Sequence, residues 1–324
     1  MDTVLGIDVS KATLDVLLRR AKQESLKGQF ANDERGWQAL AQWLRRHGGR
    51  QVHVCLEATG LYGEGVAYQL HEAGFVVSVV NPARIKAYAE SRLSRTKTDA
   101  GDAALIADFC LTQQPDAWTP PPPEQLALQS MIRRLQDLGE SLQQERNRLQ
   151  AGVHSPVVEQ NLVDHIAFLT NQITQLKRQI RDHVNQHPHL RQQEKLLESI
   201  PGIGFLTAVK LLAEIHDVLA FSSARQLAAF AGLTPHQHLS GSSVHRPAHL
   251  SKRGSPRLRA SLYMPALTAI RFNPILAVFA ERLAKAGKPK MSIIAAVMRK
   301  LIHQAFGVLK SGRPFDPNYL SCPA

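Results

Sequence analysis

The sequence has few cysteines and no long uninterrupted apolar run. Its 324 residues include three cysteines, Cys55, Cys110 and Cys322, an odd number without metal-ligand spacing. That usage is typical of reduced thiols in a cytoplasmic protein. No run of 18 or more apolar residues is present, so no membrane span is predicted. The N-terminus has no basic segment followed by an apolar one, and we therefore expect no signal peptide.

Several common catalytic motifs are missing as well. The sequence contains no GxxxxGK[ST] segment, so no P-loop for a nucleoside triphosphate is predicted. It also contains neither HExxH nor paired CxxC motifs, which gives no support for a zinc site.

The charge is unevenly distributed along the chain. The formal net charge is +12, from 39 basic and 27 acidic residues. Residues 241–324 contain 14 basic residues and two acidic ones, which leaves 25 of each in residues 1–240. A surface that merely needs solvation would scatter its excess charge. A segregated basic segment instead indicates a polyanionic partner, most simply nucleic acid.

Residues 1–118 show the pattern of an α/β domain. Short runs rich in β-branched residues predict strands, and apolar residues at helical spacing predict helices. The predicted strands are 3–9, 13–18, 51–57 and 75–80, and the predicted helices are 34–46, 62–73, 84–91 and 99–113. Strands that lead and then alternate with helices are typical of a layered α/β domain.

Residues 119–190 are predicted to form a linker and a helical region. The proline run at 119–123 is typical of a stiff linker. Beyond it, an apolar seam with nearly heptad spacing predicts a long helix: Leu162, Ile166, Leu169, Ile173, Leu176, Ile180 and Val184. A second helix precedes it, and the two join near 151–157. They form a helical hairpin or a dimerising coiled coil, or else an amphipathic pair packed on its own domain.

Residues 191–324 are predicted to be mostly helical. Residues 196–215 place a PGIG turn between two apolar helices, a helix-hairpin-helix-like segment. Such a turn can hold a phosphate through backbone N–H groups, or it can be an ordinary corner. Residues 235–256 are polar and basic and predict a long loop, which at that length is usually either functional or disordered.

Four acidic residues are candidates for catalysis: Asp8, Glu57, Asp99 and Asp102. Asp8 lies in an apolar strand, and Glu57 lies at the carboxyl end of another, where α/β sheets build sites. Asp99 and Asp102 are three residues apart at the start of a helix, on one face. Clustered carboxylates repel one another unless they bind a divalent cation such as Mg²⁺.

The structural alternatives differ among the four acids. Asp99 could be a helix N-cap, and Asp102 could stabilise the helix dipole. Asp8 and Glu57 are harder to explain in this way, because an acid in an apolar strand is expensive to bury without a partner.

A second candidate lies in the basic part of the chain. Ser240, Ser242 and Ser243 lie beside a glycine, followed by cationic residues. Cations stabilise the charged transition state when a hydroxyl attacks a phosphodiester, although such a loop is more often a flexible connector. The candidate nucleic-acid contacts are Arg246, Lys252, Arg253, Arg257 and Arg259. Residue types alone do not select the nucleophile among the serines.

Motifs along the whole chain resemble the DEDD-type transposases of the insertion sequence 110 family, which are bridge-RNA-guided serine recombinases. The resemblance lies in the order of the following segments: GIDVSK, LEATG, VVNPARIKAYAES, KTDAGDA, LLESIPGIG, FAGLTP, SGSSV, SKRG, LYMPAL and GVLKSGRPFD. One departure is HQHL at 236–239, where two histidines, His236 and His238, replace the arginine-like character expected there.

The resemblance implies three domains: an α/β RuvC-like (RNase H-type) domain over 1–118, a central helical coiled coil over 119–190 that pairs protomers, and a mostly α-helical transposase domain over 191–324. It implies that Asp8, Glu57, Asp99 and Asp102 bind Mg²⁺, with Mn²⁺ as a substitute. It implies that Ser240 is the nucleophile and forms a 5′-phosphoserine link.

The partners implied are target and donor DNA, a structured non-coding bridge RNA that pairs with both, and further copies of the chain in a dimer or a tetrameric synaptic complex. We expect a bacterial cytoplasmic protein, associated with the nucleoid when acting. Two alternatives remain: a RuvC-like nuclease or junction resolvase that uses water, and a nucleic-acid-binding scaffold whose acids are structural. The sequence does not reveal the DNA targets, the RNA, the number of subunits or the role of the two histidines.

Overall fold

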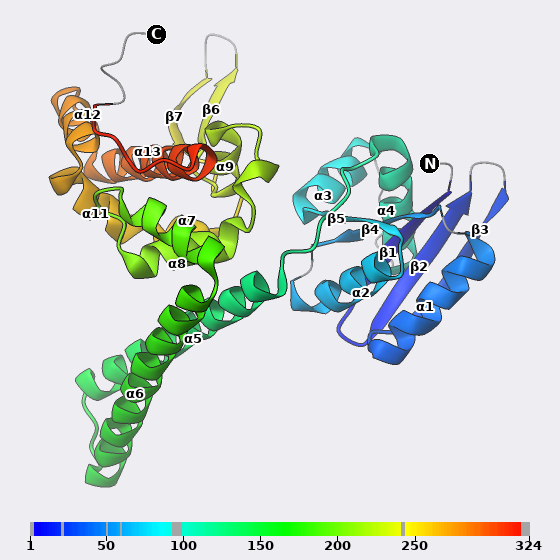
Figure 1. Ribbon diagram of the computed structural model, residues 1–324, viewed down its shortest axis with the longest axis horizontal. Coiled ribbons are helices and arrows are strands. Elements are labelled where there is room, and N and C mark those ends of the chain that lie inside the picture. The colour runs from blue at the N-terminus through cyan, green and yellow to red at the C-terminus, as the bar shows by residue number, and fades with distance from the viewer. Residues whose placement is uncertain are drawn as a thin grey trace. The chain divides into compact units, whose positions relative to one another are not determined.

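The chain forms two compact units, Met1–Pro120 and Pro121–Ala324 (Figure 1). The computed structural model describes residues 3–20, 23–49, 51–58, 60–92, 99–240 and 244–318. The boundary between the units falls inside the proline run at 119–123. The further boundary that the sequence predicts near residue 190 stays a prediction.

The N-terminal unit is built on a five-stranded mixed sheet with the order β3-β2-β1-β4-β5. Its strands are β1 (Thr3–Val9), β2 (Thr13–Arg20), β3 (Gln23–Ala31), β4 (His53–Glu57) and β5 (Val76–Val80). β1, β2 and β3 are antiparallel neighbours, whereas β1, β4 and β5 run parallel. The predicted α/β domain is therefore confirmed. Strand β3 was not predicted, because its polar, half-exposed residues lack the apolar signature of an inner strand.

Helices cover both faces of this sheet. Helices α1 (Glu34–His47) and α2 (Leu61–Glu72) share a core with Leu5 and Ile7 of β1. Helices α3 (Pro82–Ser91) and α4 (Asp99–Gln113) share a second core with Val4 and Cys55. Since successive residues of a strand point to opposite faces, the even-numbered residues of β1 face α4.

The C-terminal unit begins with a long helical hairpin. Helices α5 (Pro123–Gln150) and α6 (Pro156–Gln186) pack against each other (Figure 1), so the predicted pair of helices is confirmed. The most buried seam residues, Leu169, Ile180 and Val184, are 4 % exposed or less. The base of the hairpin joins the core of the remaining helices. Whether the hairpin also pairs two protomers remains a prediction.

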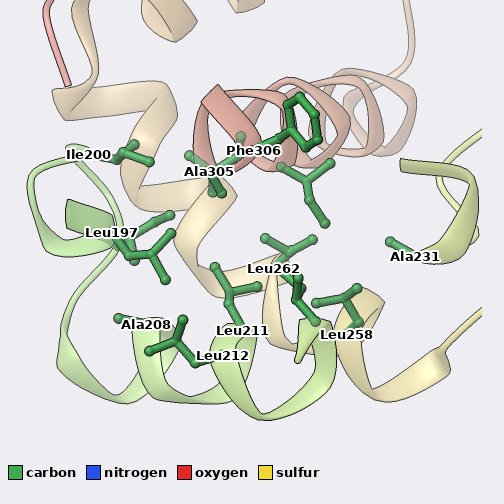
Figure 2. Close-up of a cluster of buried hydrophobic side chains, with 14 of the residues drawn as sticks. Leu197, Ile200, Ala208, Leu211, Leu212, Ala231, Leu258, Leu262, Ala305 and Phe306 are labelled. Carbon is green, nitrogen blue, oxygen red and sulfur yellow. The ribbon is translucent and has the colours of Figure 1, made fainter. Parts of the chain in front are cut away.

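The rest of the C-terminal unit is a helical bundle around one core. Its helices are α7 (Pro188–Glu198), α8 (Phe205–Ile215), the 3₁₀ turn η1 (Val218–Ala220), α9 (Ala224–Phe230), α10 (Pro256–Ser261), α11 (Tyr263–Phe272), α12 (Pro274–Lys285) and α13 (Lys290–Ser311). Figure 2 shows Leu197, Leu211, Leu262 and Phe306 converging from α7, α8, the α10–α11 junction and α13. The predicted mostly helical C-terminal region is confirmed.

Helix α13 is long and apolar enough to cross a membrane by length and composition alone. Its apolar side chains Val297, Leu301 and Ile302 are fully buried in the core of the C-terminal unit. Core helices pass the same test, and the burial of these side chains accounts for the apolar character of α13.

The prediction of a long loop over 235–256 is wrong in part. The segment contains an antiparallel hairpin of β6 (Pro235–Ser240) and β7 (Val244–Leu250). Periodicity does not reveal these strands, because histidine, proline and glutamine interrupt their apolar residues. The turn at 241–243, with Ser242 and Ser243, lies outside the described residues.

Candidate active site

Asp8 and Glu57 lie side by side on one face of the N-terminal sheet. The parallel register pairs Gly6 with Cys55 and Ile7 with Leu56, and continuing it by one residue places Asp8 opposite Glu57. Neighbouring strands are about 4.8 Å apart, so the two half-buried acids occupy adjacent positions. Both lie towards the carboxyl ends of their strands, a position that the sequence predicts for Glu57.

Helix α4 crosses this face of the sheet at Gly6. A Cβ atom at Gly6 would overlap the carbonyl oxygen of Ala103 and the backbone nitrogen of Ala107. The missing side chain therefore allows the helix backbone to lie directly on β1. This close approach requires glycine two residues before Asp8, on the same face of the strand.

The direction of α4 places its N-terminal turn at the acidic end of the strands. The Cys110 thiol, near the end of α4, donates a hydrogen bond to the His53 carbonyl oxygen at 3.7 Å. His53 is the first residue of β4, four residues before Glu57. The end of α4 thus lies at the start of β4, and its beginning lies at the end of β4. Asp99, its first residue, and Asp102 consequently lie at the same edge as Asp8 and Glu57.

Helix α4 is held in this direction by Asp108. Its carboxylate accepts a hydrogen bond from Arg19 of β2 at 2.6 Å and forms an ion pair with Arg92 at 2.9 Å. The Tyr88 hydroxyl donates to the other carboxylate oxygen at 2.7 Å. Asp108 is 9 % exposed, so these partners replace the water it lost on burial. It fixes α4 to β2 and α3. It does not belong to the edge of the sheet where Asp8, Glu57 and the first turn of α4 meet, which is called the acidic edge below.

The two buried cysteines of this unit lie behind the acids. Cys55 and Cys110 are free thiols with no exposed surface. A hydrogen bond with Cys55 lowers the pKa of the Cys110 thiol, and the same hydrogen bond, together with burial, raises the pKa of Cys55. The pair therefore joins α4 to β4 within the core.

The donor set at the acidic edge suits a hard cation. Carboxylate oxygens are the ligands that Mg²⁺ prefers, and two of them lie on adjacent strands. Among the described residues, no three histidine, cysteine, aspartate or glutamate side chains form a metal-binding group. The side chain of Asp99 lies outside the described part of the chain, as do residues 93–98. The described acids share an edge without forming a closed site.

A fifth acid, which was not predicted from the sequence, lies at this edge. Asp15 of β2 pairs directly with Asp8 in the antiparallel register, so the two carboxylates are on the same face. The Gln29 side-chain amide of β3 donates a hydrogen bond to Asp15 at 2.9 Å. The hairpin register between the predicted strands 3–9 and 13–18 would have revealed this pairing, because the tight turn fixes which residues are opposite.

The second candidate lies in the C-terminal unit. Ser240 is the last residue of β6 and pairs with Val244 across the hairpin. The side chains of Ser240, Arg246, His236 and His238 lie outside the described part of the chain. The structure thus places the Ser240 backbone at the tip end of a hairpin, beside the turn.

The basic loop that follows the hairpin is firmly held. Gly254 has a φ of +148°, and a Cβ there would overlap backbone atoms of Phe230 and Gly232. The Ser255 hydroxyl donates to Glu214 at 2.9 Å and accepts from the Leu258 amide. Lys252 and Arg253 are exposed on this loop, which therefore presents two cations from a fixed backbone.

The two arginines of α10 differ in their surroundings. Arg257 is exposed. The Arg259 guanidinium donates to the Ala231 and Lys252 carbonyl oxygens, both at 3.3 Å. Arg259 thus holds the backbone of the basic loop in place, whereas the exposed Arg257 side chain can contact a ligand.

The PGIG turn at 201–204 is partly occupied by packing. Gly202 has a φ of +108°, and a Cβ there would press on Ala269 of α11. The Asn273 side chain, which is fully buried, donates to the Pro201 carbonyl oxygen at 3.3 Å. Only Gly204, at the start of α8, has open space beside it. These contacts indicate that the turn serves mainly as a structural corner between α7 and α8.

Comparison with known proteins agrees with these observations. A model of DEDD-type transposases matches residues 5–155, and a second model, described as transposase IS116/IS110/IS902 family, matches residues 194–281. The chain is 36 % identical to a pilin gene-inverting protein of Moraxella bovis, over 97 % of this chain and 98 % of that protein.

Other relatives point the same way. A pilin gene-inverting protein of Moraxella lacunata is also 36 % identical, over 97 % of this chain and 98 % of its own length. A transposase for insertion sequence element IS1111A of Coxiella burnetii is 43 % identical over 23 % of this chain and 20 % of its own. The chain belongs to the IS110 family of transposases, whose DEDD-type model covers the acidic edge described above.

Proposed function

We propose that this transposase cuts and rejoins DNA strands through a 5′-phosphoserine intermediate on Ser240. The observation that carries the proposal is the placement of Asp8, Glu57 and the first turn of α4 at one edge of the five-stranded sheet. Carboxylates gathered at one edge repel one another, and a divalent cation bound there, as in a nuclease, would offset that repulsion.

The chemistry divides between the two units. Asp8, Glu57, Asp99 and Asp102 would hold Mg²⁺ or Mn²⁺, and the cation when bound would stabilise charge on the scissile phosphate. The Ser240 oxygen would attack phosphorus as the bond to the 3′ oxygen breaks, and the serine proton would end on the released 3′-hydroxyl. One phosphodiester replaces another, so rejoining needs no nucleoside triphosphate, consistent with the missing P-loop.

The sequence of the DNA would be selected by a bridge RNA. In such a system base pairing reads the sequence and the protein holds backbones. The basic excess of residues 241–324 suits that task. The exposed cations Lys252, Arg253 and Arg257 would contact backbones, Arg246 is a further candidate, and Arg259 would position the loop. We place this activity at the nucleoid of a bacterial cell.

The test is a covalent adduct between the protein and a DNA substrate. Purified chain, with the RNA that copurifies, is incubated with a labelled target and donor DNA in Mg²⁺ and analysed under denaturing conditions. The wild type and Ser242→Ala should form the adduct, and Ser240→Ala should not, while all three bind DNA equally. An adduct that survives in Ser240→Ala refutes the nucleophile assignment. Adduct loss in Asp8→Asn with binding intact would support the catalytic role of the acids.

A water-using nuclease is the second candidate, and one observation favours it. The described acids of this edge all belong to the N-terminal unit. A nuclease of this kind would turn over without an adduct and would tolerate Ser240→Ala but not Asp8→Asn. The same experiment therefore separates the two.

We also propose that the α5–α6 hairpin pairs protomers. The buried seam of α6 faces α5, so pairing must use other residues. Val157 and Phe168 are 79 % and 57 % exposed on α6, and a partner helix could cover these large apolar side chains. Phe168→Asp should lower the mass measured by analytical ultracentrifugation to that of the monomer, whereas Thr174→Asp, on the same helix, should not. An unchanged mass in Phe168→Asp would exclude this face.

A further inference from the structure

Three cations lie on α9 and α13, two helices that pack against each other. Arg299 and Lys300 lie on α13, and Arg225 lies on α9. None of the three forms an ion pair with an acid among the described residues. Arg225 and Lys300 are exposed, and Arg299 is half-buried. Like charges held close together repel one another. An anion bound near these three side chains would reduce that repulsion.

His303 lies among these cations. It is one turn from Arg299 and Lys300 on the same face of α13. Its Nε2 atom is buried and has no hydrogen-bond partner. Burial lowers the pKa of the imidazole first, and the positive charges of Arg299, Lys300 and Arg225 lower it further. These cations, from α13 itself and from α9, are the charged groups that act on it in the described part of the chain. At neutral pH the ring is therefore uncharged.

The cluster is held in place by its surroundings. Leu227 and Ala228 of α9 and Leu301 and Ile302 of α13 belong to one core and are fully buried, which fixes the two helices against each other. The Lys300 ammonium lies 5.6 Å from the centre of the Phe279 ring of α12, a cation–π distance. The cations are thus presented from a rigid surface.

We propose that Arg225, Arg299 and Lys300 form a binding site for the phosphodiester backbone of a nucleic acid, with His303 beneath it. Arginine and lysine side chains on one surface suit phosphate groups spaced along a strand. No base edge is needed, which suits a protein that leaves sequence selection to another molecule. The inference rests on the proposed function for the identity of the polyanion. It adds a contact surface outside the 246–259 segment.

The site predicts a change at His303 when a nucleic acid binds. An anion over the cluster cancels part of the positive potential that disfavours the charged imidazole. The pKa of His303 should then rise towards its usual value, although burial keeps it from recovering fully. This response distinguishes an anion at the cluster from one bound elsewhere on the basic surface.

The first measurement is the salt dependence of binding, made in EDTA so that no strand is cut. A fluorescent duplex DNA and a structured RNA are titrated separately with wild type, Arg225→Gln, Lys300→Gln and the double variant. For duplex DNA, each lost phosphate contact should reduce the slope of log K against log salt by about 0.9. Lys285→Gln is the matched control, because it removes one exposed charge that already pairs with Glu281 at 2.7 Å.

The second measurement is the proton NMR titration of the histidine rings. The spectrum of His303→Gln identifies the His303 signal. Its pKa should rise when saturating DNA or RNA is added to the wild type, and it should rise less in the double variant. Thermal melts check that the exposed substitutions leave the fold intact.

The outcomes separate clearly. A slope reduction with duplex DNA alone assigns the site to DNA, one with RNA alone assigns it to RNA, and one with both assigns it to the shared backbone. Slopes equal to those of Lys285→Gln for both ligands overturn the proposal, as does a His303 pKa that saturating nucleic acid leaves unchanged. Because no strand is cut, the result stands apart from the adduct test. Failure of Ser240 as nucleophile would leave this binding site unaffected.

Discussion

Replacing Gly6 with alanine should loosen the contact on which the acidic edge depends. The new methyl group would overlap the Ala103 carbonyl oxygen and the Ala107 nitrogen of α4. These are backbone atoms, so no side-chain rotation relieves the overlap and the helix must move. Overpacking of this kind costs about 3 kcal/mol at the upper end of its usual range. The lower chain entropy of alanine offsets about 0.5–1 kcal/mol, which leaves a net loss of about 2 kcal/mol.

The N-terminal unit can be followed by itself during unfolding. All three tryptophans, Trp37, Trp43 and Trp118, lie in that unit, so their fluorescence reports its transition in the full chain. With a urea dependence of about 2 kcal/mol per molar, Gly6→Ala should lower the midpoint by about 1 M. Gly139→Ala is the control, because nothing lies within 4 Å of the added Cβ in α5. Its tryptophan transition should match the wild type.

The same variant tests the geometry of the acids. A displaced α4 carries Asp99 and Asp102 away from Asp8 and Glu57, so binding of Mn²⁺, measured by electron paramagnetic resonance in urea-free buffer, should weaken. A tryptophan midpoint that is unchanged or higher would refute the packing of α4 on Gly6. A lower midpoint with unchanged Mn²⁺ affinity would refute the claim that this packing aligns the carboxylates.

Three further outcomes follow from individual contacts. Asp108→Asn keeps the shape of the side chain but weakens its charge-assisted bonds to Arg19 and Arg92, and should cost about 2 kcal/mol in the tryptophan transition. Burial, with the neighbouring Glu198 carboxyl, raises the pKa of Glu194 above 4.5. The folded state therefore keeps its proton longer, and stability should fall as pH rises from about 4.5 through the folded pKa. Glu194→Gln should flatten that fall in circular dichroism melts. Arg259→Lys cannot reach both carbonyl oxygens that Arg259 holds, and should speed hydrogen exchange in residues 251–254 without unfolding the bundle.

The parts of the fold that the sequence predicts well are those with a strong burial signal. Strands β1 and β4 alternate or run apolar because both faces of the sheet are covered, and each acid in them stands out against that background. The apolar spacing of α6 likewise predicts its packing on α5. In each case the residues that form the element also form its core.

The parts that the sequence misses depend on pairing between distant or polar residues. Strand β3 is an edge strand with half-exposed polar residues, and β6 and β7 pair histidine with histidine at one position. None of these three strands shows a regular alternation of apolar and polar residues in its own sequence. Asp15 was missed for a related reason, because its place beside Asp8 comes from the register between two strands. Gly6 carries no local signal for the approach of α4, which begins 93 residues later in the chain.

Local clusters of opposite charge lie in the two units, and they bear on the choice between a recombinase and a nuclease. At the acidic edge, carboxylates of β1, β2 and β4 lie on one face of the sheet. In the C-terminal unit, cations lie in the α9–α13 cluster and in the loop at 251–254. A hydrolase needs only the first of these and a path for water. A serine that stays covalently bound to DNA must also keep the cut ends from diffusing away until they are rejoined. Backbone contacts that depend on charge and not on sequence would meet that need, and the exposed cations of the C-terminal unit would supply them under the proposed mechanism.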